Sequence, residues 1–158
     1  MIDIPSISAV LAAVGVIVGV VFAVLELRNL VKARQTDLVI RLYTHMDSLE
    51  FLKAFHKIFW MPEFKNYDDF AEEFSGNRYI VSFVCLFFDG IGVLLRRKLI
   101  DISLVDDLLG NSTKQIWEKI RTPMMEVRKR GIDPRAYENF EYLYNEMKKR
   151  EKQLAKIQ

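Results

Sequence analysis

An uncharged run at the start of the chain constrains its fold more than any other feature. From Ile4 to Leu25 no residue carries a charge, and the run is bounded by Asp3 and Glu26. A helix of this length rises about 33 Å, which is enough to cross a hydrocarbon core of about 30 Å. The run has no polar face that could turn to water, so it predicts a transmembrane helix over residues 4–25. A buried core helix is the alternative.

The flanks of this run favour an uncleaved anchor over a cleaved signal peptide. A signal peptide has a basic region before its apolar run and small residues at a cleavage site after it. This chain begins MIDIPS instead, and the run continues into FAVLELRNL, a sequence that favours helix. Arg28, Lys32 and Arg34 follow the run, and basic flanks stay in the cytoplasm. We therefore expect a single-pass protein of the cell membrane, with residues 1–3 outside and residues 26–158 inside the cell.

Small side chains recur along one side of the predicted span. They are spaced 4, 3, 4 and 4 residues apart, with a Gly-x-x-x-Gly pair at the centre of the stripe. Small residues let two membrane helices approach closely, although glycine and alanine are also common in membrane helices generally. The pattern favours a homo-oligomer held together by this stripe. Its members are Ser8, Ala12, Gly15, Gly19 and Ala23.

The rest of the chain, residues 26–158, is expected to fold as one small all-α domain in the cytoplasm. No Gly or Pro interrupts residues 27–60, so a long helix is predicted over about 26–60, ended by Pro62. A core helix is expected over about 78–97. Gly110 is expected to close a short helix, and further helices are predicted over about 113–130 and 134–156, the last opened by the pair Asp133-Pro134.

The stretch from Ile80 to Leu95 leaves two interpretations open. It is the second most apolar part of the chain, but sixteen residues are few for a span, and an aspartate inside a membrane is costly. We favour a bundle helix covered by neighbours on every side, in which Gly90 and Gly92 are packing or kink positions. A buried Asp89 would then need an arginine or a helix end as its partner. A second membrane span is the alternative.

Three groups of residues in the second half of the chain form a pattern. They are Phe87, Phe88 and Gly92, then Leu99, Ile100 and Asp101, and then Trp117 and Pro123. This pattern resembles an uncharacterised prokaryotic family that is known as a domain of unknown function. The resemblance covers about residues 1–145. It implies a membrane helix near the N-terminus followed by a small helical domain, and it carries no catalytic residue across.

No motif for catalysis, cofactor or metal binding is present in the sequence. It has no Gly-rich phosphate loop, no paired cysteines, no Gly-x-Ser-x-Gly and no His-Glu-x-x-His. A net charge of +2, with acids interspersed among the bases, argues against nucleic acid as a partner. We therefore expect no enzyme, no cofactor and no metal site.

Two histidines are the one less ordinary feature of the predicted long helix. His45 and His56 are eleven residues apart, close to three helical turns, and would share a face with Leu38, Leu42 and Leu49. Neutral imidazoles in a half-buried core are the plain interpretation. A pH-sensitive interface is the functional one, because a protonated imidazole weakens an apolar contact.

These features indicate where the protein works rather than what reaction or partner it serves. The preferred hypothesis is a self-associating interaction or scaffold module held at the cytoplasmic face of the membrane, with an unidentified protein as a further partner. The alternative is a homo-oligomeric channel, in which a ring of single spans encloses a pore. The number of subunits separates the two, since a dimer excludes a ring.

Overall fold

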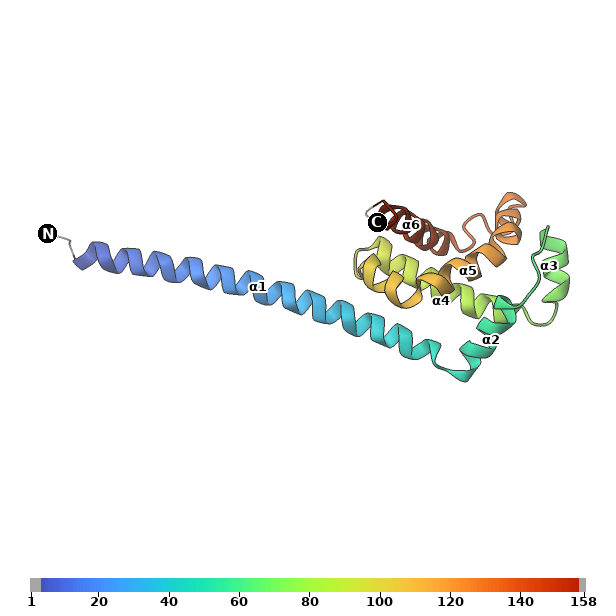
Figure 1. Ribbon diagram of the computed structural model, residues 1–158, viewed down its shortest axis with the longest axis horizontal. Coiled ribbons are helices and arrows are strands. Elements are labelled where there is room, and N and C mark those ends of the chain that lie inside the picture. Colours follow the sequence, from blue (N-terminus) through green and yellow to red (C-terminus); the bar gives the residue numbers. More distant parts are fainter. Residues whose placement is uncertain (1–3, 157–158) are drawn as a thin grey trace. The chain divides into compact units, whose positions relative to one another are not determined.

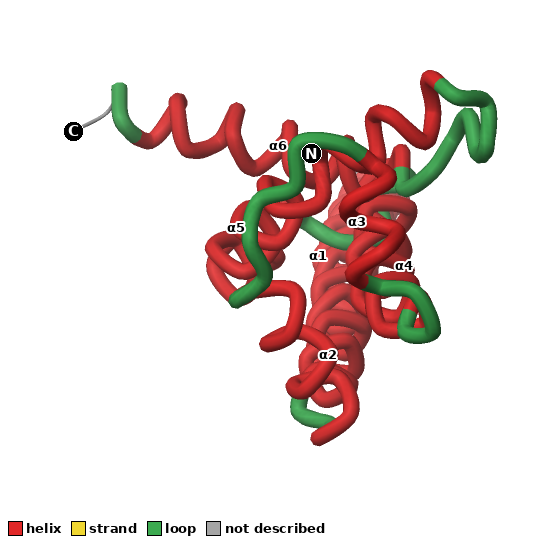
Figure 2. The backbone as a smooth tube through the Cα atoms, turned by 90° about the vertical axis from the view of Figure 1, so that its right-hand side faces the viewer, coloured by secondary structure: helices red, strands yellow, loops and turns green. Residues whose placement is uncertain are grey.

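The computed structural model describes residues 4–156, with the side chains of residues 8, 9 and 11–156. Residues 1–3, expected outside the cell, lie outside this part. The described residues form six α-helices and no strand, which confirms the all-α class (Figure 2). The chain divides into two compact units, Met1–Leu38 and Val39–Gln158. The helices are α1 (Ile4–Met46), α2 (Leu49–Phe59), α3 (Tyr67–Glu73), α4 (Arg78–Arg96), α5 (Ile102–Lys129) and α6 (Glu138–Leu154).

The first unit is formed by the N-terminal part of α1, one uninterrupted helix in Figure 1. From residue 11 to residue 34 every side chain is exposed, although most of those before Glu26 are apolar. The exposed fraction reaches 67% at Leu11 and 68% at Phe22. None of the other described residues covers this apolar surface, and such exposure is typical of a membrane anchor or a signal sequence.

The expectation of one helix over residues 26–60 is corrected by a break at residues 47–48. Ser48 has an extended backbone (φ −66°, ψ 138°), and its side-chain oxygen accepts a hydrogen bond from the Phe51 amide at 3.2 Å. This is the geometry of a helix N-cap, for which serine is a favoured residue. The polar pair Asp47-Ser48 therefore ends α1 and starts α2 without any Gly or Pro.

The second unit has a hydrophobic core of its own. Among the described residues, every buried apolar side chain lies between Val39 and Met147. Trp117 of α5 packs against Phe140 of α6 with ring centroids 5.0 Å apart, and Phe140 stacks on Phe88 of α4 at 4.9 Å. These three helices form the centre of the second unit. We call the second unit the bundle.

Helix α5 runs through a glycine that was expected to end a helix. Gly110 was expected to close a helix and residues 113–130 to form another, but the structure has one helix over Ile102–Lys129 with Pro123 inside it. Gly110 is buried in this helix, and a Cβ there would overlap the Asp106 carboxylate. The glycine makes room for a neighbouring side chain and does not end the helix.

Helix α6 begins four residues later than the sequence predicts. Tyr137, directly before it, adopts a left-handed backbone conformation with φ 51°. The side chain of Asp133 accepts a hydrogen bond from the Arg135 amide at 3.0 Å, so it caps a turn. The expected helix over 134–156 is therefore a turn followed by α6, and the amides at the start of α6 need another acceptor.

Candidate functional site

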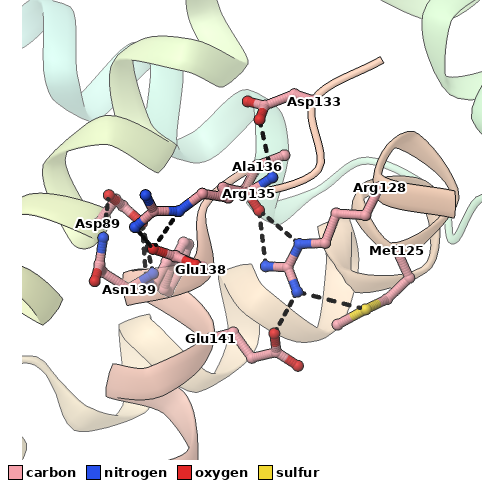
Figure 3. Close-up of polar contacts among 10 residues, drawn as sticks. Asp89, Met125, Arg128, Asp133, Arg135, Ala136, Glu138, Asn139 and Glu141 are labelled. Carbon is pink, nitrogen blue, oxygen red and sulfur yellow. Dashed lines mark hydrogen bonds and ion pairs between the residues drawn. The ribbon is translucent and has the colours of Figure 1, made fainter. Parts of the chain in front are cut away.

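The acceptor for the start of α6 is Asp89 of α4 (Figure 3). Its carboxylate accepts hydrogen bonds from the backbone amides of Asn139 and Phe140, at 2.9 and 3.0 Å, and from the Asn139 side-chain amide at 3.2 Å. A carboxylate at a helix N-terminus also interacts favourably with the helix dipole. The expectation that Asp89 pairs with an arginine or a helix end is met by the helix end.

Gly92, one turn further along α4, brings the same two helices into backbone contact. It is buried, and a Cβ added to it would overlap the carbonyl group of Asn139. Asp89 and Gly92 therefore fix α4 against the first turn of α6. Residues 80–95 belong to the bundle, as favoured from the sequence.

Neighbours cover only one side of α4, however, so the expectation that every side is covered is wrong. Of its most apolar 18-residue stretch, 39% is buried. Val84, Phe88 and Ile91 are fully buried, whereas Tyr79 and Leu86 are 67% and 62% exposed. The helix therefore carries an exposed apolar side that the sequence pattern alone did not reveal.

Polar groups at the α5–α6 connection are engaged with one another. The Arg128 guanidinium donates to the Ala136 carbonyl oxygen at 2.7 and 3.0 Å and forms an ion pair with Glu141 (Figure 3). Arg135 forms an ion pair with Glu138. These contacts hold the connection between the two helices in place.

The two histidines do not share a helical face, because the break at residues 47–48 separates them. His45 is near the end of α1 and exposed, with its ring centroid 5.7 Å from that of Phe83, 5.8 Å from Phe87 and 6.0 Å from Phe51. His56 is exposed on α2. A joint role at a pH-sensitive interface stays a prediction, and the geometry favours His45 as the residue that would carry it.

The small-residue stripe of α1 is exposed. Ser8, Ala12 and Ala23 are all exposed, and a Cβ added to Gly15 or Gly19 would have no atom within 4 Å. Packing within the chain therefore does not require glycine at these two positions. The role of the stripe in oligomerisation stays a prediction.

Two hollows border the exposed side of α4. The larger, about 580 Å³, lies between α2 and α4, and the surface that faces into it is mostly carbon. Its wall consists of Glu50, Lys53, Ala54, Lys57, Tyr79, Ile80 and Phe83. The smaller, about 280 Å³, has Arg78, Ser82 and Asp133 among its polar residues and Tyr137 beside them. Burial raises the pKa of the Tyr137 hydroxyl above its ordinary value.

Sites for metal or thiol chemistry do not emerge from the geometry. No group of three or more His, Cys, Asp or Glu side chains among the described residues could hold a metal ion. Cys85 is fully buried in α4, and burial raises the pKa of its thiol far above the usual range, so the reactive thiolate is not formed. The sequence could not have distinguished this inert cysteine from a reactive one.

Comparison with known proteins identifies the family of the chain. The pattern of the family described as Domain of unknown function (DUF4760) matches residues 13–147, which is most of the chain, so the chain belongs to that family. No curated protein matches it. No solved structure matches it either.

Proposed function

We propose that this DUF4760 protein is a membrane-anchored, self-associating module that presents its helical bundle at the cytoplasmic face of the membrane. The observation that carries the proposal is the exposure of α1. Its most apolar 18-residue stretch is 0% buried, whereas the bundle has a core of its own. A helix with this surface fits a membrane anchor or a signal sequence, and the continuation of α1 to Met46 favours an anchor.

Extraction of cell membranes tests the anchor. The full chain is expected to stay in the membrane pellet after washing with carbonate, while a fragment of residues 39–158 is expected to be released. A tag at the N-terminus should be labelled from outside intact cells and a tag after Gln158 should not. Release of the full chain by carbonate would overturn the anchor, and external labelling of the C-terminal tag would overturn the orientation.

Self-association through the small-residue stripe is the second part of the proposal. A Cβ added to Gly15 or Gly19 would meet nothing within 4 Å, so no contact among the described residues explains these glycines. In a lipid environment, apolar side chains gain little by leaving lipid for each other, and close backbone approach is a main source of attraction. Two copies meeting at the stripe would use the space that these glycines leave.

Substitution by a larger side chain tests this contact in the full protein. Gly15→Ile and Gly19→Ile are expected to lower the particle mass in mild detergent to that of a monomer, because isoleucine forces the two backbones apart. Val18→Ile, on a different side of α1, is the matched control and should leave the mass unchanged. Three masses equal to that of the parent would exclude the stripe as the contact, and a mass of five or more subunits for the parent would favour the ring-shaped channel.

A further inference from the structure

The exposed side of α4 carries apolar and aromatic side chains rather than the polar ones that face water in most bundle helices. Tyr79, Phe83 and Leu86 are 67%, 36% and 62% exposed. Their spacing of four and three residues puts them on one side of the helix, opposite the buried Val84 and Phe88. This side of α4 is apolar, and no described part of the bundle covers Tyr79 or Leu86.

Basic side chains surround these three residues. Lys53 and Lys57 stand on α2 at the wall of the 580 Å³ hollow that Tyr79 and Phe83 also line. Arg78 begins α4, and Arg97 follows its last residue on the same side as Tyr79. We call these seven residues, Tyr79, Phe83, Leu86, Lys53, Lys57, Arg78 and Arg97, the basic-aromatic face.

The charges of this face are not neutralised within the described part of the chain. None of its four basic side chains forms an ion pair there, and all four are exposed. Glu50 is the acidic residue on the wall of the hollow. Three arginines elsewhere differ, because Arg128 in α5, Arg130 directly after it and Arg150 in α6 are each paired with a carboxylate. Unpaired cations around an apolar surface favour an anionic occupant.

We propose that the basic-aromatic face of the bundle lies against the anionic lipid headgroups of the membrane that anchors the chain. Aromatic and leucine side chains insert at the boundary between headgroups and acyl chains, and lysine or arginine beside them attracts anionic lipid. The inference rests on the proposed function, because the anchor is what brings the bundle to the bilayer. The 580 Å³ apolar hollow offers space for part of a lipid between α2 and α4.

A second copy of the chain fits this face less well than lipid does. Symmetric pairing of two such faces would bring the lysines and arginines of one copy against those of the other. Like charges at short distance repel, and the described carboxylates beside the face are only two, Glu50 on the wall of the larger hollow and Asp133 on the wall of the smaller one, against four basic side chains. The charge of the face therefore selects an anionic surface over a self-contact.

A polarity-sensitive fluorophore on the full chain tests the contact in lipid nanodiscs. The dye is attached to Leu86→Cys, on the basic-aromatic face, and in the control protein to Leu108→Cys, which is on α5 beside Asp106 and Asp107. Leu108 is 45% exposed, so the labelled positions are comparably accessible. The buried Cys85 is expected to stay unlabelled, which the parent protein checks. Discs contain phosphatidylcholine alone or a mixture with phosphatidylglycerol.

The expected result is a blue-shifted emission for the dye at position 86 in the anionic discs, a smaller shift in neutral discs and no shift at position 108. Lys53→Gln combined with Lys57→Gln should lower the ratio of lipid-bound to free bundle about 25-fold, since each lysine near an anionic surface contributes about fivefold. Lys65→Gln combined with Lys129→Gln, at a different hollow, should leave the shift unchanged.

Three outcomes would overturn the proposal. The first is a water-like emission at position 86 while the chain co-purifies with anionic discs, which leaves the anchor intact. The second is a shift that needs two or more chains per disc, which would assign the face to a second copy. The third is a chain that fails to co-purify with the discs, which removes the anchor and the membrane contact together.

Discussion

Helices α1 and α4 are both long and apolar enough to cross a membrane, yet they behave differently within the chain. The most apolar stretch of α1 is 0% buried, and that of α4 is 39% buried. Both contain two glycines. A Cβ at Gly15 or Gly19 of α1 would meet open space, whereas a Cβ at Gly92 of α4 would overlap the backbone of Asn139. Length and hydropathy alone therefore do not separate a membrane-type helix from a bundle helix.

The difference is made by one carboxylate and one glycine. Asp89 would be costly in the middle of a membrane, but in the bundle it accepts three hydrogen bonds from the first turn of α6. Gly92 permits the close approach that this requires. The apolar part of α1 before Glu26 contains no carboxylate, and its glycines contact no other helix among the described residues. A carboxylate within an apolar run, such as Asp89, thus indicates that the run packs against a hydrogen-bond donor of the protein.

The largest effect expected in this comparison comes from adding one methyl group to α4. Gly92→Ala should lower the free energy of unfolding of the bundle by about 3 kcal/mol, because the Asn139 carbonyl must move. Gly90→Ala is the matched control on the same helix, where a Cβ would meet nothing within 4 Å. It should stabilise the helix by up to about 1 kcal/mol. Denaturant unfolding measures both, and equal effects would contradict the close contact.

The next effect concerns the start of α6. Asp89→Ala leaves the amides of Asn139 and Phe140 without their acceptor, which should cost about 2 kcal/mol. The two amides should also exchange with solvent faster than in the parent protein, which hydrogen exchange detects by residue. Protection that is unchanged at both amides would mean that the cap contributes nothing to α6.

A smaller effect is expected at the junction of α1 and α2. Ser48→Ala removes the oxygen that accepts from the Phe51 amide and should destabilise the bundle by about 1 kcal/mol. Ser48→Asp keeps an acceptor at this position and should retain most of the stability. The melting temperatures of the two variants measure the difference, and identical values would exclude a capping role.

The smallest effect is ionic and depends on pH. Asp68 forms two hydrogen bonds with the Arg130 guanidinium, at 2.6 and 2.7 Å, and these lower the pKa of its carboxyl. Because the pKa is lower in the folded than in the unfolded state, the pair stabilises the bundle above about pH 4, and the stabilisation is lost as pH falls through the lowered pKa. The melting temperatures of the parent and Asp68→Asn should differ slightly at neutral pH and converge in acid. A difference that persists in acid would show that charge is not its cause.

The sequence predicted the features that depend on composition over long stretches. The apolar run before Glu26, the all-α class and the helix over about 78–97 all follow from periodicity and from the absence of breakers. It did not predict the break at Ser48, although a serine followed by helix formers is a start signal, because no Gly or Pro marked the position. The sequence also predicted that a helix ends at Gly110, whereas the helix continues there and the glycine makes room for Asp106.

The exposed side of α4 could not be predicted, because the residues on both sides of this helix are apolar. Which side becomes buried is decided by α6, through Asp89 and Gly92, and those contacts join residues about fifty positions apart. The spacing of apolar residues within α4 does not indicate which of its sides another helix such as α6 will cover. The basic residues of α2 that border the same surface are brought there only by the fold.

The hydrogen bonds between Asp89 and α6 also impose an order on folding. Tyr137 offers no side-chain cap, so the start of α6 is defined by a residue that is synthesised fifty positions earlier. We therefore expect α6 to gain its full stability only when it packs on α4, which requires the intervening loop to close first. Until the ribosome releases the C-terminal segment, the rings of Phe88 and Trp117 lack their partner Phe140. The nascent bundle exposes these rings for that interval, and transiently exposed apolar surface favours aggregation.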